Sequence, residues 1–158
     1  TFINKWYSKM FFALNVSLLF NKKEKNILFR FTMLRTFNNP IIIRIERKDN
    51  KYKLIWKKSN GAGGYEPGIL SLNKEKEITE KEWRKFIELV NKSEFWNLQT
   101  VEKESGGCDG SVWILEGTSY DYYHVVSRWT PRGSEFYNCC DYLISLTNLK
   151  FNDMDEKY

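Results

Sequence analysis

The stretch that most restricts the fold is IIIRIERKDNKYKLIWKK, residues 41–58. A two-residue turn at Asp49 and Asn50 would fold it into a β-hairpin, because apolar and polar residues alternate on both sides of that turn. On one face the cross-strand pairs are then Ile45 with Leu54, Ile43 with Trp56 and Arg47 with Tyr52. On the other face Glu46 lies opposite Lys53, which is an attractive pair. Both faces are chemically consistent in this one register, so the stretch predicts an antiparallel sheet.

The polar face of this hairpin predicts a basic surface, and the residues assigned to it are Arg44, Lys51, Lys53 and Lys57. Residues 1–60 hold 14 Lys and Arg against 3 acids, whereas residues 61–158 hold 11 against 17, for a formal net charge of +5. We favour the interpretation that the two halves attract each other or form solvated faces. The alternative is a surface for nucleic acid, lipid headgroups or an acidic protein.

Hydrophobic periodicity predicts most of the other elements. Apolar residues spaced i, i+4 indicate an amphipathic helix that ends near Asn15, and ILFRFTML (27–34) alternates as a strand with one buried face. ILSLNKEKEI (69–78) is expected to be a short strand that runs into a charged turn. SVWILEG (111–117) and YYHVVSRW (122–129) are expected to be strands. The apolar spacing from Phe136 to Thr147 predicts a C-terminal helix.

The helix expected within TEKEWRKFIELVNKSEF (79–95) has the clearest start signal. Thr79 as the N-cap and Glu82 three residues later form a capping box. The apolar stripe that follows at helical spacing is expected to be core: Trp83, Phe86, Ile87 and Val90.

Together these elements predict an α+β fold with the order α-β-β-β-β-α-β-β-α. We expect a single domain over residues 1–150, with an antiparallel sheet covered on one face by helices. The chain has 158 residues, 42% of them hydrophobic, which is enough for one core. Residues 151–158 are expected to be an acidic, frayed tail. The longest nearly uncharged run, Met10–Phe20, is too short and too polar to span a bilayer.

The glycine-rich stretch SNGAGGYEPGIL, residues 59–70, raises the question of a phosphate site. No Lys-Ser or Lys-Thr follows the last glycine and no helix signature opens there, so it matches neither a P-loop nor a dinucleotide fingerprint. We expect it to turn the chain, with Pro67 and Gly68 in a type II turn. Tyr65 would then be held outward, with Glu66 beside it, and both are candidate binding residues. We expect Tyr65 at the sheet end, either packed against DGSVW and SRWTP or grouped with Arg128 and Trp129.

Few residues suggest catalysis. His124 is the one imidazole, and it lies within a strand with no nucleophile elbow nearby, so we expect a hydrogen-bonded sheet histidine and keep it as a candidate binding residue. Asp109, in a CDG turn, is expected to cap backbone amides and is also kept as a candidate. Arg128 and Trp129 are a combination typical of recognition surfaces, and the alternative is an arginine stacked over a core tryptophan. We expect no catalytic residue and no cofactor.

The three cysteines are Cys108, Cys139 and Cys140. None belongs to a CxxC pair and one histidine is available, so no metal site is expected. If the protein is exported, a bridge between Cys108 and one of the two adjacent cysteines is an option; otherwise we expect three reduced thiols.

Several motifs together resemble a family of small, uncharacterised bacterial proteins. They are WY at Trp6, LRTF with Pro40 beyond it, GAGGYEPG, DGSVWILEG, YHVVSRWTP and CDYLISL, and they span roughly Trp6–Leu149. The resemblance implies no activity, cofactor or substrate, although members often begin with an export signal. An export signal removed ahead of Thr1 would imply the periplasm or envelope, and its absence the cytoplasm. Cys108 stands where an apolar residue is expected in that family, which argues against a family-wide disulfide.

These observations favour a non-enzymatic binding or interaction module of a bacterial cell, with a protein partner. The first alternative is an immunity or inhibitor protein that neutralises a toxin or enzyme. The next is a single-stranded nucleic-acid binder that uses the basic hairpin and its aromatic residues. The least favoured is a hydrolase or transferase that uses His124.

Overall fold

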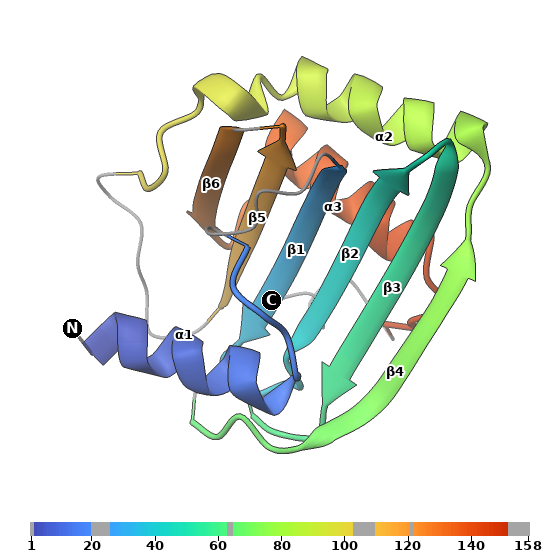
Figure 1. Cartoon of the computed structure of the whole chain (residues 1–158). Helices are drawn as coiled ribbons and strands as arrows, with labels where there is room; N and C mark the ends of the chain where they lie inside the picture. The colour runs from blue at the N-terminus through green and yellow to red at the C-terminus, as the bar shows by residue number, and fades with distance from the viewer. Residues whose placement is uncertain (1, 20–25, 63–64, 103–109, 121, 152–158) are drawn as a thin grey trace.

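The computed structural model describes residues 2–19, 26–62, 65–102, 110–120 and 122–151, with residues 2–6 as backbone (Figure 1). In chain order the elements are α1 (Phe2–Ala13), β1 (Ile27–Arg35), β2 (Ile41–Lys48), β3 (Lys51–Ser59), β4 (Leu70–Glu77), α2 (Glu80–Lys92), the 3-10 turn η1 (Phe95–Asn97), β5 (Ser111–Ser119), β6 (Tyr122–Trp129) and α3 (Glu135–Ser145). The six strands form one antiparallel sheet in the order β4-β3-β2-β1-β5-β6. The predicted α+β class and element order are confirmed.

The β2–β3 hairpin has the predicted register. Ile43 pairs with Trp56 and Glu46 pairs with Lys53. Both turn residues have positive φ, 49° at Asp49 and 61° at Asn50, as a type I′ turn requires. Local turn chemistry and cross-strand pairing therefore agree, which is why this register could be predicted from sequence.

The main core lies between one face of the sheet and the helices α2 and α3; in Figure 1 α3 passes behind the strands and α2 runs along the top of the view. Phe29 and Phe31 of β1 are fully buried on this face. The α2 stripe is core as predicted for Trp83, Phe86 and Val90, while Ile87 is half-buried at its edge.

Helix α1 lies on the other face of the sheet, in front of the strands in Figure 1. Met10 packs there with Leu34 of β1 and Ile114 of β5. The expectation that helices cover one face is therefore correct for α2 and α3 and wrong for α1.

Strand β1 is consequently buried on both faces, which corrects the expectation of a single buried face. Thr32 and Arg30 alternate with the apolar residues but are 0% and 2% exposed. The alternation in sequence marks two different environments, an apolar core beneath α2 and α3 and a mixed polar layer on the α1 side.

Strand β4 runs through the whole of Leu70–Glu77, where a short strand followed by a charged turn was expected. Lys and Glu side chains along this edge are exposed, and Lys53 Nζ lies 3.0 Å from Glu75 Oε1 across β3 and β4. The charges suit an edge strand, because they discourage pairing with another chain, and they do not interrupt the backbone ladder.

Helix α2 begins as predicted. The Thr79 side chain accepts from the Glu82 backbone N–H, and a Glu82 carboxylate oxygen lies 2.7 Å from the Thr79 backbone nitrogen. Over the described residues, every helix is too short or too polar to cross a membrane.

Candidate functional site

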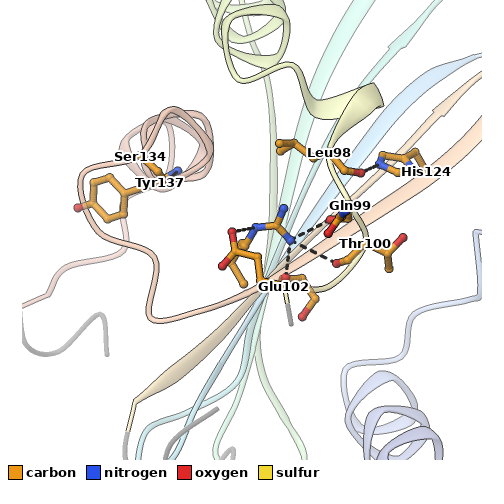
Figure 2. A network of polar contacts seen from close by, with 9 residues as sticks. Leu98, Gln99, Thr100, Glu102, His124, Ser134 and Tyr137 are labelled. Carbon is orange, nitrogen blue, oxygen red and sulfur yellow. Dashed lines mark hydrogen bonds and ion pairs between the residues drawn. The ribbon is translucent and has the colours of Figure 1, made fainter. Parts of the chain in front are cut away.

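The His124 side chain contacts a backbone carbonyl and an aromatic ring of the same fold. Its Nε2 lies 2.9 Å from the Leu98 carbonyl oxygen, and Phe95 of η1 packs edge-on against the ring at 5.2 Å. Figure 2 shows His124 directed at the segment that follows η1. The imidazole thus holds that segment beside β6, as expected for a hydrogen-bonded sheet histidine.

Arg128 is buried rather than presented to solvent, with 7% of its surface exposed. Its Nη1 donates to the carbonyl oxygens of Gln99 at 2.9 Å and Ser127 at 2.8 Å, and its Nε lies 2.9 Å from Glu102 Oε1 (Figure 2). The guanidinium lies 5.8 Å from the ring centroid of Phe136, not over the tryptophan suggested by the sequence. Arg128 therefore ties the segment after η1 to the sheet and to α3.

Trp129, the next residue, points to the opposite face and is half-buried. There it lines a cavity of about 530 Å³ between α1, β5, β6 and Thr100–Val101. Tyr7 of α1 also lines this cavity and hydrogen-bonds the Ser127 side chain. Trp129 also lines a second cavity together with Arg128, between the segment after η1 and the start of α3, so the predicted pair shares one environment and Trp129 reaches another.

A buried polar network lies at one end of that cavity, between β1, β5 and β6. Arg30 Nε donates to Glu116 Oε2 at 2.6 Å, and Nη2 contacts the same oxygen at 2.6 Å without hydrogen-bond geometry. Tyr123 donates to Glu116 Oε1 at 2.9 Å. Burial and the neighbouring Glu116 carboxylate raise the pKa of the Tyr123 hydroxyl well above its usual range.

Sequence reasoning missed this network. Arg30 alternates with apolar residues, as a solvent-facing strand residue does, and Glu116 lies near the end of a strand. Their contact depends on the Arg30–Glu116 pairing between strands that are 86 residues apart in sequence. The sequence signal is one charged residue next to an apolar run in each strand, Arg30 in β1 and Glu116 in β5.

The glycine-rich loop between β3 and β4 turns the chain, as predicted. Gly68 has φ of +64°, and a side chain there would overlap the backbone of Gly61. A Cβ on Gly61 would in turn overlap the Glu66 carbonyl oxygen. These glycines are needed for close backbone approach, which explains them without a phosphate.

Tyr65 stands out from that loop, 70% exposed, and Glu66 beside it is also exposed. Its ring centroid lies 6.2 Å from that of Phe37 in the β1–β2 connection. The predicted association with the SRWTP segment is wrong, because Tyr65 follows β3 whereas Trp129 ends β6, with three strands between them. At about 4.8 Å per strand, β3 and β6 are roughly 19 Å apart.

The residues of the predicted basic surface differ in the groups that they contact. Arg44 Nε lies 3.3 Å from Glu46 Oε2, and Lys53 pairs with Glu75. Lys57 Nζ donates to the Asn15 carbonyl oxygen at 2.8 Å. Burial and the positive charge of Arg44 lower the pKa of Lys57. Lys51, at the hairpin turn, is exposed.

The adjacent cysteines Cys139 and Cys140 are both buried in α3 as free thiols. Burial raises the pKa of Cys139 to about 12 and that of Cys140 further. Cys108, the candidate Asp109 and the residues of the expected tail after 151 lie outside the described residues.

Comparison of the chain with models of known protein families and with curated protein sequences finds no match.

Proposed function

We propose that this chain is a non-enzymatic binding module of a bacterial cell that captures a protein partner. The contact surface is the loop cluster, which we define as Phe37, Tyr65 and Ile69. The observation that carries the proposal is the exposure of these three bulky apolar side chains, which are 66%, 70% and 71% exposed. An inhibitor or immunity protein would act through such a surface and is one form of the proposal.

Hydrogen bonds tie the backbone segments that carry the loop cluster. Asn39 Nδ2 donates to the Gly61 carbonyl oxygen at 2.8 Å, which joins the β1–β2 connection to the β3–β4 loop. Asn60 and Ile69 are joined twice, from the Asn60 N–H to the Ile69 carbonyl at 3.0 Å and from the Ile69 N–H to Asn60 Oδ1 at 2.9 Å. Side chains on a rigid backbone lose little conformational freedom on binding, which favours affinity.

Aromatic residues are also the usual anchors of protein interfaces, because one ring buries a large apolar area with few rotatable bonds. Phe37 and Tyr65 already contact each other, so a partner can cover both with one pocket. The Tyr65 hydroxyl and the neighbouring Glu66 carboxylate supply polar groups at the rim.

The two candidates on β6, His124 and Arg128, are engaged by contacts within the fold. The His124 ring nitrogen and the Arg128 guanidinium are engaged with backbone carbonyls and Glu102. A general base needs access to the proton that it removes, and a ring nitrogen that is already hydrogen-bonded to the backbone is less available for that role.

Nucleic-acid binding has less support from the basic hairpin. Arg44 and Lys53 lie beside carboxylates, and Lys57 donates to a backbone carbonyl. Cations with such partners gain less from neutralising phosphates.

Site-specific photo-crosslinking in the native cell tests the loop cluster. A benzophenone amino acid at position 37 or 65 should capture one and the same protein. The control position is Tyr122, which is 77% exposed and lies at the opposite end of the sheet. Capture from position 37 should be lost in Tyr65→Ala and kept in Tyr122→Ala. Equal capture from position 122, or capture that Tyr65→Ala does not reduce, would contradict the proposal.

A further inference from the structure

A second cavity, of about 240 Å³, lies on the α1 side of the sheet and is separate from the loop cluster. Its walls are the segment 15–19, which follows α1, and strands β1 to β4. Its lining residues include Arg30, Ile42, Arg44, Ile55 and Lys57. The volume is below the range of about 300–1,000 Å³ that is typical for drug-sized ligands, so it suits a smaller molecule.

The charged groups on the wall are predominantly positive. Arg30, Arg44 and Lys57 are opposed by one lining carboxylate, Glu75, which already lies 3.0 Å from Lys53. The charge of Arg30 is neutralised by Glu116, which does not line this cavity. Arg44 Nε lies 3.3 Å from Glu46 Oε2.

Lys57 differs from the other two cations, because its hydrogen-bond acceptor is the neutral Asn15 carbonyl. Burial lowers the pKa of Lys57 first, and repulsion from Arg44 lowers it further. The space between Arg44 and Lys57 is therefore at positive potential, where an anion would be stabilised.

Donor hydrogens are also available for an anion. Arg30 Nη2 and Arg44 Nε are buried, and within the part of the chain that the structure describes their contacts with the Glu116 and Glu46 carboxylates lack hydrogen-bond geometry. The Arg30 side chain is only 2% exposed, so solvent does not readily supply an acceptor. A buried donor whose hydrogen is poorly aligned with its acceptor costs free energy, and a well-placed ligand oxygen would lower that cost.

We propose that this cavity binds a small organic carboxylate. The carboxylate lies between Arg44 and Lys57, and the apolar body of the ligand lies against Ile42 and Ile55. Two features favour such a ligand over inorganic phosphate. The aliphatic side chains give an apolar body an area to cover, and the Glu75 carboxylate on the wall disfavours a second negative charge.

The probe is benzoate, added to the full chain at constant ionic strength and followed by NMR of backbone amides and lysine side-chain amines. Benzoate should shift the signals of Ile42, Ile55 and Lys57 in a saturable way. The pKa of Lys57 should rise on binding, because a nearby anion favours the charged ammonium. A role for Lys57 in folding alone would not move that pKa when benzoate is added.

Benzamide and inorganic phosphate are the matched ligands. Benzamide keeps the ring but lacks the charge, and it should bind at least about tenfold more weakly, since hydrogen bonds to charged groups are the stronger ones. If benzamide bound with the same affinity as benzoate, the assignment of an anion site would be overturned. If inorganic phosphate bound with the same affinity as benzoate, the assignment of an organic ligand would be overturned. The cavity would then hold an adventitious ion only.

Lys57→Gln and Arg44→Gln should each weaken benzoate binding by about tenfold or more. Lys51→Gln is the matched control, because it removes the same charge from an exposed residue of the same hairpin and should leave binding unchanged. Equal weakening in all three variants would mean that net charge, not this cavity, attracts benzoate. Thermal unfolding of each variant verifies that it folds, and the Lys57 pKa in the unmodified chain provides a test that needs no variant.

Discussion

Arg30 and Glu116 face each other across β1 and β5 and form a buried ion pair, with 2.6 Å between Arg30 Nε and Glu116 Oε2. Their side chains are 2% and 7% exposed. The Phe11 ring of α1 lies 4.7 Å from the guanidinium, and Arg30 Nη1 donates to the Ser17 carbonyl oxygen at 2.6 Å. The pair therefore joins the sheet to α1 and to the segment that follows it.

Removing one member of this pair should be costly, because it leaves the other as an uncompensated buried charge. We expect Glu116→Gln to lower the free energy of unfolding by about 3–5 kcal/mol, measured by urea denaturation. The double variant Arg30→Met/Glu116→Leu should be more stable than Glu116→Gln, since no buried charge remains. A double variant less stable than that single variant would show that the uncompensated charge is not the main cost of removing Glu116.

Trp56→Ala should lower the free energy of unfolding by about 3–5 kcal/mol, as large aromatic truncations in cores do. Trp56 is 5% exposed and packs in the main core opposite Ile43. Its indole nitrogen makes no hydrogen bond within the described residues, so the loss is one of packing. Phe12→Ala is the control, because Phe12 is 88% exposed and should change stability by less than about 0.5 kcal/mol. A cost under about 1 kcal/mol for Trp56→Ala would contradict the packing seen here.

Cys139 and Cys140 should not react with a thiol reagent in the folded protein. Burial raises the pKa of Cys139 to about 12, and the thiolate forms only as pH rises through the pKa. At about pH 8 both thiols are therefore neutral as well as inaccessible. A Cys108→Ser background removes the third thiol, and Ellman's reagent should then report no thiol in buffer and two in denaturant. Rapid labelling in buffer would be inconsistent with a closed core around α3.

The capping box should make stability depend on pH through Glu82. Hydrogen bonding, chiefly from the Thr79 backbone N–H, lowers the pKa of Glu82. The folded pKa is below the unfolded value of about 4.3, so the stabilisation is present above that value and is lost as pH falls through the folded pKa. Stability should therefore fall less in Glu82→Gln than in the unmodified chain between about pH 5 and 3. Glu88→Gln, on the same helix, is the control and should leave the acid dependence unchanged.

The full chain should not be retained on single-stranded DNA at about 150 mM salt, since phosphate contacts weaken steeply as salt rises. The reason is structural as well as electrostatic, because Arg44 and Lys53 already lie beside carboxylates. Fluorescence anisotropy with a labelled oligonucleotide measures this directly. Tight binding at that salt, with a steep dependence of affinity on salt concentration, would favour the basic hairpin as a nucleic-acid surface.

Local sequence patterns predicted the features that depend on neighbouring residues. The β2–β3 register follows from a turn that needs two positive φ angles and from pairs that match on both faces. The Thr79–Glu82 capping box is likewise complete within four residues. The exposed position of Tyr65 follows from glycines that bring the loop backbone close to itself.

Only the tertiary structure decided which face each helix covers and which distant residues meet. An alternating strand such as β1 has the same pattern whether its second face meets water or α1, so sequence could not reveal that Arg30 is buried. The pairing of Arg30 with Glu116 and the contact of Tyr65 with Phe37 both require the strand order of the sheet. Periodicity fixes which residues share a face of one element, whereas the partner of that face is set by burial and charge summed over the whole chain.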